Sequence, residues 1–331
     1  ALSSLGDGSS LSQGEADEVA STLSAHIQQL REEVSYLELH MNELKITEPA
    51  VGEGATASVY RALWVSPGAI EEVDECSDAS ASSSMTESGA RFITDPGVEV
   101  ALKKFNYVAA QPPPKALKEF KTEVAALRKL PPHPNVVRLI GACTNPGMAI
   151  VYEYMPQGTL FHALRSKLTL SLDDRLALAL DCATGLQHLH ANSILHRDIK
   201  SHNILLDLHQ GRLRAKLGDL GCSRVLAETG DEAMAKTELG TAGYVAPEVL
   251  YGVPYAFPAD VFSLGVLLYE IFAPAGKDGR INLPTKDIPI GRYCMEFDKG
   301  YRMQWPDVPV GAPEWVLPLV HECMQADPSA R

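Results

Sequence analysis

The pattern of apolar and polar positions differs between the two halves of the chain. In the first half, short apolar runs rich in β-branched and aromatic residues predict strands. These runs cover residues 98–105, 136–139 and 149–152. One longer segment, from Pro114 to Leu130, instead places Phe120, Val124 and Leu127 on a single helical face. We therefore expect a small sheet that is accompanied by one helix.

Helical patterns dominate the second half. The segments Leu172–Leu189 and Val261–Phe272 carry long apolar faces, and a strand-like triplet, Ile204 to Leu206, lies between them. A chain of 331 residues exceeds the usual size of one hydrophobic core. The sequence thus predicts an α+β fold with two parts, a β-rich one over residues 46–152 and a helical one over residues 153–331.

Residues 1–45 form an extension with a pattern of its own. Apolar residues recur there at alternating spacings of four and three, as in a heptad seam. The seam residues are Leu23, Ile27, Leu30, Val34 and Leu37. Two interpretations of this amphipathic helix stay open. It pairs with a second copy to form a homodimer, or it packs on the β-rich part of its own chain.

The net charge of −13 is concentrated in two stretches. Residues 1–45 and residues 65–98 each carry a balance of −6, so the remainder is close to neutral. The second stretch is serine-rich, lacks periodicity and separates two strands, which predicts a disordered acidic insertion. This distribution of charge argues against a nucleic-acid or anionic-membrane partner.

Cysteine usage and hydropathy bear on the compartment. The six cysteines are scattered without a Cys-x-x-Cys pair, so we expect reduced thiols in a cytoplasmic protein. The longest apolar run, Val261 to Ala275, contains Ser263, Tyr269 and Glu270. It is too short and too polar to span a bilayer, so no membrane span is expected.

A polar loop, His196 to Asn203, carries the strongest candidate chemistry. Asp198 is placed to accept a proton from an attacking hydroxyl, Lys200 to neutralise charge on a transferring group, and Asn203 to offer a hard oxygen to a metal ion. Taken alone, such residues in a loop more often belong to an ordinary surface turn. The other motifs in the chain therefore decide the interpretation.

Five further sequence features accompany this loop in a fixed order. A glycine turn, Gly52-Glu53-Gly54, precedes the strand that carries Lys103, and Glu123 follows on the predicted helix. After the loop come Asp219-Leu220-Gly221 and Ala246-Pro247-Glu248. Together with the loop, these motifs resemble those of the eukaryotic protein kinases.

The resemblance covers about residues 46–331 and points to the tyrosine-kinase-like group, Raf-like or mixed-lineage-like. The run at 139–143 is similar to that group, while Lys200 and Thr241 are similar to serine/threonine-specific members. The resemblance implies a bilobal kinase fold whose last helix is missing here. It also implies transfer of the ATP γ-phosphate, with Mg²⁺, to Ser or Thr hydroxyls of a protein substrate.

The resemblance also implies a role for each motif residue. The implied catalytic residues are Asp198, Lys200, Lys103 and Glu123, and the implied metal ligands are Asn203 and Asp219. The residues implied to contact the nucleotide are Gly52, Gly54, Val59, Ala101, Lys103, Glu153, Met155 and Leu205. Tyr152 is expected to narrow the back of the nucleotide site, and Glu248 to pair with Arg331.

Two residues depart from the family pattern. Ala57 replaces the third glycine of the glycine-rich loop and Leu220 replaces a phenylalanine, which keeps a catalytically weak pseudokinase acting as a scaffold in view. Every charged catalytic position is filled, however, and this favours an active enzyme. Arg197, which precedes Asp198, implies control by phosphorylation of the activation segment. The candidate sites are Thr229, Thr237 and Thr241, and we expect Thr237 to be the one used.

Overall fold

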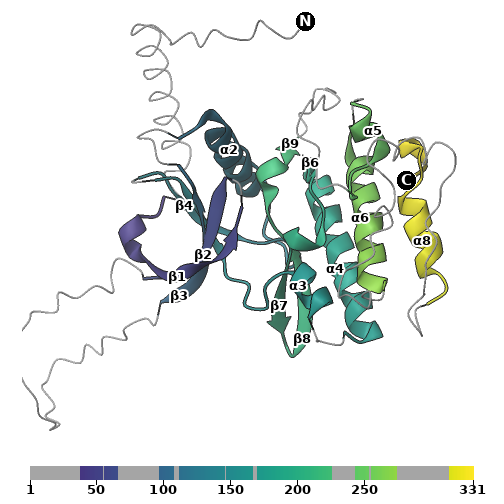
Figure 1. The fold of residues 1–331 in the computed structure, drawn as a ribbon, viewed down its shortest axis with the longest axis horizontal. Helices are drawn as coiled ribbons and strands as arrows, with labels where there is room; N and C mark the ends of the chain where they lie inside the picture. Colours follow the sequence, from purple (N-terminus) through teal and green to yellow (C-terminus); the bar gives the residue numbers. More distant parts are fainter. Residues whose placement is uncertain are drawn as a thin grey trace, which may run out of the picture.

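The structure is a computed structural model. It describes residues 38–54, 56–65, 97–107, 112–145, 147–166, 170–225, 243–252, 255–273 and 313–331. Within these ranges a small lobe built on a sheet adjoins a larger helical lobe (Figure 1), and the predicted bilobal α+β fold is confirmed. The heptad seam, residues 66–96 of the acidic insertion and Thr237 lie outside the described residues.

Five antiparallel strands form the sheet of the small lobe, in the order β1-β2-β3-β5-β4. Their bounds are β1 Leu44–Glu53, β2 Ala57–Trp64, β3 Val98–Phe105, β4 Leu139–Cys143 and β5 Ala149–Glu153. Side chains alternate between the two faces. Leu102 and Val151 therefore enter one apolar cluster, while Ile150 and Tyr152 belong to the larger one on the opposite face.

Helix α2, Pro114–Lys129, covers the face that carries Ile150 and Tyr152. It begins with proline at its first position, where the missing N–H costs nothing. Phe120 is fully buried and meets Phe105 edge-on, with 5.7 Å between ring centroids. Lys103 follows Leu102 on β3, so its side chain points to the α2 side of the sheet.

The segment before β1 also packs on the small lobe. The Leu39 N–H donates to the Ala142 carbonyl at 2.9 Å, and the turn η1, Met41–Glu43, leads directly into β1. Leu44 is buried as the first residue of that strand. The apolar residues at 41 and 44 thus serve the sheet rather than a continued heptad seam.

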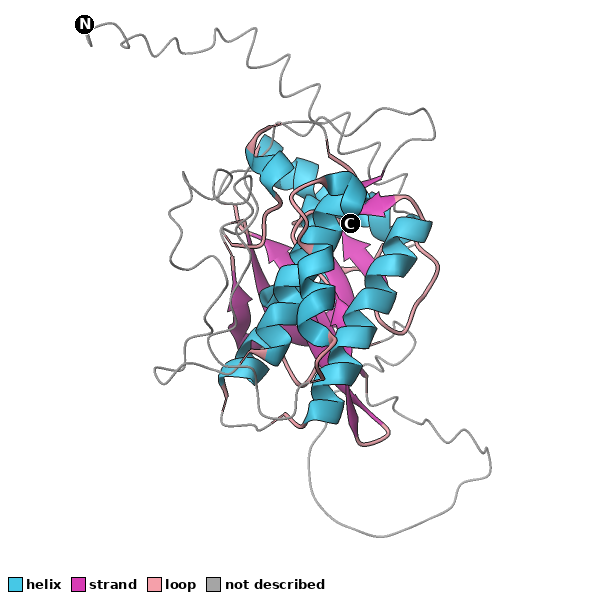
Figure 2. Cartoon of the chain, turned by 90° about the vertical axis from the view of Figure 1, so that its right-hand side faces the viewer, coloured by secondary structure: helices cyan, strands magenta, loops and turns pink. Residues whose placement is uncertain are grey.

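The large lobe is a bundle of helices, as Figure 2 shows. Their bounds are α3 Leu160–Arg165, α4 Leu172–Ala191, α5 Pro247–Leu250, α6 Phe257–Phe272 and α8 Val316–Cys323. Helix α4 begins with a capping box between Ser171 and Asp174. Helix α6 is buried around its whole circumference, which makes it the central helix of the lobe. None of the described helices combines the length and apolar character that a bilayer crossing requires.

Two short pairs of antiparallel strands hold the ends of the loops that lie between the lobes. Strand β7, Ile204–His209, pairs with β8, Arg212–Leu217, and β6, Ile194–Leu195, pairs with β9, Arg224–Val225. The polar loop that contains Asp198 connects β6 to β7 through the turn η2, Ser201–Asn203. The turn η3, Leu220–Cys222, follows β8. These connections bring the candidate residues of the large lobe to the side that faces the sheet.

Candidate active site

The loop that carries Asp198 is held by Asp260 of α6. The buried Asp260 carboxylate accepts the backbone N–H groups of His196 and Arg197, each at 2.8 Å, and lies 2.9 Å from Nε2 of His190. Arg197 has a φ of 73°, which is costly for a residue with a side chain and persists only where surrounding bonds enforce it. Asp198 is therefore presented from a fixed backbone.

Asp198, Lys200 and Asn203 lie within hydrogen-bond distance of one another. Lys200 Nζ is 2.6 Å from Asp198 Oδ2, and Asn203 Nδ2 donates to the same oxygen at 2.9 Å. Because the amide nitrogen of Asn203 faces Asp198, its amide oxygen points away from that carboxylate. The Gly218 N–H donates to the Asn203 carbonyl at 2.9 Å, which brings the following residue, Asp219, close to Asn203.

Lys103 joins the two lobes through two carboxylates. Its Nζ lies 2.8 Å from Glu123 Oε2 on α2 and 2.7 Å from Asp219 Oδ1. Burial opposes the charge on Lys103, but Glu123 and Asp219 together raise its pKa, so it stays protonated. Lys103 in turn lowers the pKa of Asp219 to about 2. A Cβ at Gly221 would lie 3.2 Å from Glu123 Oε2, so this turn favours glycine.

Tyr152 makes a hydrogen bond that the sequence pattern did not predict. Its hydroxyl donates to Glu123 Oε1, so the two oxygens of this fully buried carboxylate bond to Tyr152 and Lys103. Burial raises the pKa of Glu123, and the bonds from Lys103 and Tyr152 act against that rise. A tyrosine that follows three apolar residues of a buried strand was the available signal, because a buried hydroxyl requires a partner.

The glycine-rich turn is fixed at its second half. The Gly54 N–H donates to the Ala57 carbonyl at 2.8 Å, and a Cβ at Gly54 would lie 3.2 Å from that oxygen. Gly52 pairs with Val59 across the hairpin. Thr56 Oγ1 donates to Glu119 Oε2 on α2 at 2.8 Å, a contact that no sequence pattern predicts. The turn is thereby tied to the same helix that carries Glu123.

The other residues implied for the nucleotide come from both lobes and from the connection between them. Val59 pairs with Lys103 in the sheet and Ala101 lies two residues before it, so all three share one face. Leu205 comes from β7 of the large lobe and is partly buried. Glu153 and Met155 lie in the connection between the lobes, where the Glu153 carboxylate bonds both of its oxygens to Lys216 Nζ at 2.7 Å.

Comparison with known proteins decides the family. A family model described as "Protein kinase domain" matches residues 91–331. This chain belongs to the protein kinase family. The expectation of a eukaryotic protein kinase that resembles the tyrosine-kinase-like group is confirmed by this match together with the relatives below.

Three relatives illustrate the match. The probable serine/threonine-protein kinase drkC of Dictyostelium discoideum is 36% identical over 240 residues, which are 71% of this chain and 30% of that protein. In Arabidopsis thaliana, the serine/threonine-protein kinase STY17 is 36% identical over 218 residues, 65% of this chain and 35% of its own. The serine/threonine/tyrosine-protein kinase HT1 of the same plant is 34% identical over 217 residues, 64% of this chain and 51% of its own. The kinase chain thus spans half or less of the length of most of these relatives.

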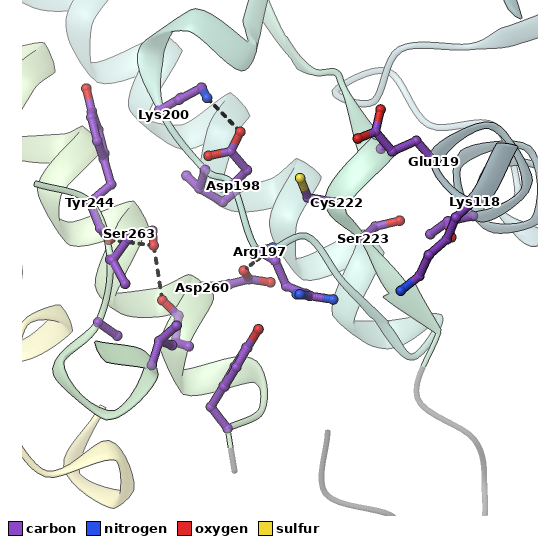
Figure 3. A pocket seen from close by; sticks show the side chains of 18 of the residues that line it. Lys118, Glu119, Arg197, Asp198, Lys200, Cys222, Ser223, Tyr244, Asp260 and Ser263 are labelled. Atoms are coloured by element: carbon purple, nitrogen blue, oxygen red, sulfur yellow. Dashed lines mark hydrogen bonds and ion pairs between the residues drawn. The ribbon is translucent and has the colours of Figure 1, made fainter. Parts of the chain in front are cut away.

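A cavity of about 520 Å³ opens beside Asp198 of the kinase. It lies between the start of α2, the catalytic loop, η3 and the first turns of α5 and α6 (Figure 3). Lys115, Lys118, Arg197 and Lys200 line it from two sides, and Ser223 lines it with a buried hydroxyl. The wall of this cavity therefore carries several positively charged side chains close to Asp198.

The kinase motif at Glu248 is anchored to the end of the described chain. Arg331 donates to the two carboxylate oxygens of Glu248 at 2.6 and 2.9 Å, and its side chain is fully buried. Arg331 also donates to the carbonyls of Gln325 and Pro258. Such a bidentate pair holds α5 against α6 and the last turn.

Proposed function

We propose that this kinase transfers the γ-phosphate of ATP, in the presence of Mg²⁺, to serine or threonine hydroxyls of a protein substrate. The observation that carries the proposal is the position of Lys103, which contacts Glu123 and Asp219 at the same time. Phosphoryl transfer depends on placing phosphates and hydroxyl in line, so a lysine joined to both lobes is what the reaction requires.

We propose that side chains and backbone groups of both lobes bind the ATP. In this proposal Lys103 holds the α- and β-phosphates, and the glycine turn covers them. The adenine lies between the wall formed by Val59 and Ala101 and the side chain of Leu205. The Glu153 N–H already donates to the Arg138 carbonyl at 3.1 Å, and the Met155 carbonyl accepts from Gly158 at 3.1 Å. We therefore assign the adenine hydrogen bonds to the Glu153 carbonyl and the Met155 N–H.

The residues proposed for Mg²⁺ suit that ion. Mg²⁺ prefers hard oxygen ligands and usually takes one or two carboxylates plus phosphate oxygens. The depressed pKa of Asp219 keeps its carboxylate ionised, and the amide oxygen of Asn203 points away from Asp198. When bound, the ion would neutralise charge that builds up on the phosphates. Asp219 and Asn203 would hold it on the large-lobe side of Lys103.

Asp198 is proposed to orient the substrate hydroxyl and to accept its proton. Asn203 and Lys200 hold the Asp198 carboxylate by bonds of 2.9 and 2.6 Å, and Lys200 remains close enough to follow the transferred phosphoryl group. This division leaves the nucleotide contacts to Lys103 and Asp219. The two tasks can therefore be separated by mutation.

Asp198→Asn tests this division. Removing a positioned general base should lower the turnover number by about 10²–10⁴-fold, while ATP affinity and the midpoint of thermal unfolding stay close to the wild-type values. Steady-state phosphorylation and titration with a fluorescent ATP analogue measure the two effects. An unchanged rate refutes the role of Asp198, and loss of ATP binding shows that the residue is structural instead.

Regulation by phosphorylation is a second part of the proposal. The cavity beside Asp198 is lined by Lys118, Arg197 and Lys200, and a phosphate there would form about one to three charge-assisted hydrogen bonds. We propose that phosphorylated Thr237 supplies this phosphate and orders the activation segment.

Phosphatase treatment and Thr237→Ala should each lower the rate of substrate phosphorylation, whereas the matched variant Thr229→Ala should not. The rate is followed with labelled ATP on one peptide substrate. If the Thr237→Ala enzyme keeps full activity and is insensitive to phosphatase, control by phosphorylation of Thr237 is contradicted.

A further inference from the structure

A cluster of aromatic and basic side chains lies beside the catalytic loop, formed by Phe161, His162 and Arg165 of the α3 region and His202 of η2. The His202 ring stacks on the Phe161 ring with 3.6 Å between centroids. The Arg165 guanidinium carbon is 3.5 Å from the same ring centroid, and His162 meets the ring edge-on at 5.6 Å. One ring thus gathers three nitrogen-bearing side chains.

This cluster borders the place proposed for the acceptor hydroxyl. His202 directly precedes Asn203, whose amide contacts the Asp198 carboxylate at 2.9 Å. The side chains of His162 and His202 are exposed, so an incoming peptide can reach them. A substrate that presents a serine to Asp198 must lay a neighbouring residue across this surface, because successive residues of an extended peptide are only about 3.3–3.6 Å apart.

The carboxylates near the cluster already bond to groups of the protein. Glu270 is buried, accepts from Ser201 Oγ at 2.8 Å and from the Tyr244 hydroxyl, and lies 3.7 Å from Arg165 Nη1. Asp198 is bonded to Lys200. A basic substrate residue would have to displace Arg165 to reach Glu270. Each exposed imidazole of the cluster can donate one ring N–H to a substrate.

Electrostatic attraction also favours an anionic ligand at this cluster. Arg165 places a permanent positive charge 3.5 Å from the Phe161 ring centroid, and Lys200 precedes His202 by two residues, so positively charged groups flank the exposed imidazole. A substrate anion bound there would offset those charges and gain charge-assisted hydrogen bonds.

We propose that Phe161, His162, Arg165 and His202 form a substrate subsite for an anionic side chain, a carboxylate or a phosphate, close to the acceptor residue. The subsite disfavours arginine and lysine at that position. The proposal rests on the proposed kinase activity and adds the chemical class of the preferred substrate. Arg165 acts by occupying Glu270, and His202 acts by direct contact with the substrate anion.

A peptide set tests the preference on the full chain. Each peptide carries one serine acceptor, with glutamate, phosphoserine, alanine or arginine at one nearby position. At one or more positions we expect kcat/KM for the anionic peptide to exceed that for the arginine peptide by about tenfold or more, the effect of one charge-assisted hydrogen bond. Preference for both anions assigns the subsite to charge, and preference for phosphoserine alone assigns it to a substrate phosphorylated beforehand. Equal rates, or faster phosphorylation of arginine peptides, overturn the proposal.

Two variants and a control attribute the preference to the cluster. His202→Glu should reverse the ratio of anionic to basic peptides, and Arg165→Met should raise the relative rate on arginine peptides because Glu270 becomes accessible. His209→Glu makes the same change at an exposed histidine at the far end of β7 and should keep the wild-type ratio. A ratio that neither His202→Glu nor Arg165→Met alters contradicts the subsite. Failure of the wild type to phosphorylate every peptide instead contradicts the proposed function, and the subsite with it.

Discussion

At the scale of single residues, the stability of the small lobe depends on how the buried carboxylate of Glu123 is hydrogen-bonded. A fully buried carboxylate is costly unless its charge is paired and both oxygens are hydrogen-bonded. Lys103 meets one oxygen and Tyr152 the other. Tyr152 therefore does more than fill the back of the proposed nucleotide site. It also fixes the position of Glu123, which contacts Lys103.

Tyr152→Phe removes one of these bonds without creating a cavity. It should lower the free energy of unfolding by about 1–3 kcal/mol, the cost of a buried acceptor that loses its donor. Urea denaturation measures this loss. Tyr154→Phe, two residues further and only partly buried, is the control and should stay within about 0.5 kcal/mol of wild type.

The same variant should change the pH dependence of catalysis. Burial already raises the pKa of Glu123, and losing the Tyr152 hydroxyl raises it further, while Lys103 and Asp219 keep facing the carboxylate. Glu123 then becomes protonated at higher pH as the solution is acidified. The acid limb of kcat/KM should therefore move to higher pH in Tyr152→Phe. A limb that does not move contradicts this part of the account.

Sequence could supply the charged members of the site but not this contact. Lys103, Asp198 and Asp219 lie in motifs whose order along the chain is informative. Tyr152 and Glu123 lie 29 residues apart on a strand and a helix whose relative placement is set by packing. No periodic pattern encodes which oxygen of Glu123 a distant hydroxyl reaches. The same applies to Thr56 and Glu119, which belong to a turn and a helix.

At the scale of elements, the pairing of β2 and β3 is regular up to the end at which the acidic insertion connects the two strands. The two strands pair without a break from Ala57 with Phe105 to Trp64 with Val98. The acidic insertion therefore leaves and re-enters the sheet at directly opposed residues. The pairing of the strands does not require anything in between, since opposed strand ends can be joined by a two-residue turn.

Replacing residues 66–96 by a two-residue type I′ turn such as Asn-Gly should therefore preserve ATP turnover within about twofold. The entropic cost of closing a loop falls with its length, so the short turn does not destabilise the hairpin. Turnover and the midpoint of thermal unfolding are compared with those of the full chain. A folded variant without activity would show that the insertion contributes to the catalytic lobe.

Helix and strand positions were largely predictable, and the misses have physical reasons. The pattern from Pro114 to Leu130 became α2, Pro114–Lys129, because its apolar face matched the helical period. Helix α6 begins at Phe257, four residues before the predicted Val261. Pro258 lies in the first turn of the helix, where proline is tolerated because its missing N–H would have no partner there. The packing of α4 depends on Gly185, where a Cβ would lie 2.5 Å from the Asn135 carbonyl, and sequence gives no measure of such an approach.

At the scale of the whole molecule, the two lobes are linked by backbone bonds as well as by Lys103. The Val137 N–H donates to the Leu217 carbonyl at 2.9 Å, and the buried side-chain amide of Asn135 donates its Nδ2 hydrogen to the Ala215 carbonyl at 3.0 Å. Both contacts join the segment before β4 to β8, which leads directly to Asp219. The position of Asp219 against Lys103 is thus a property of the joined lobes, and activity should depend on that junction.

Magnesium-dependent incorporation of phosphate from ATP, measured for the wild type beside Lys103→Met, tests this account most directly. The substitution keeps the length of the side chain and removes the charge that joins Glu123 to Asp219. The wild type should phosphorylate a protein substrate, and Lys103→Met should lose about 10²-fold or more of that rate while remaining folded. If the wild type incorporates no phosphate, kinase activity is contradicted and the pseudokinase that acts as a scaffold is favoured. A Lys103→Met rate equal to that of the wild type would contradict the central role of this lysine.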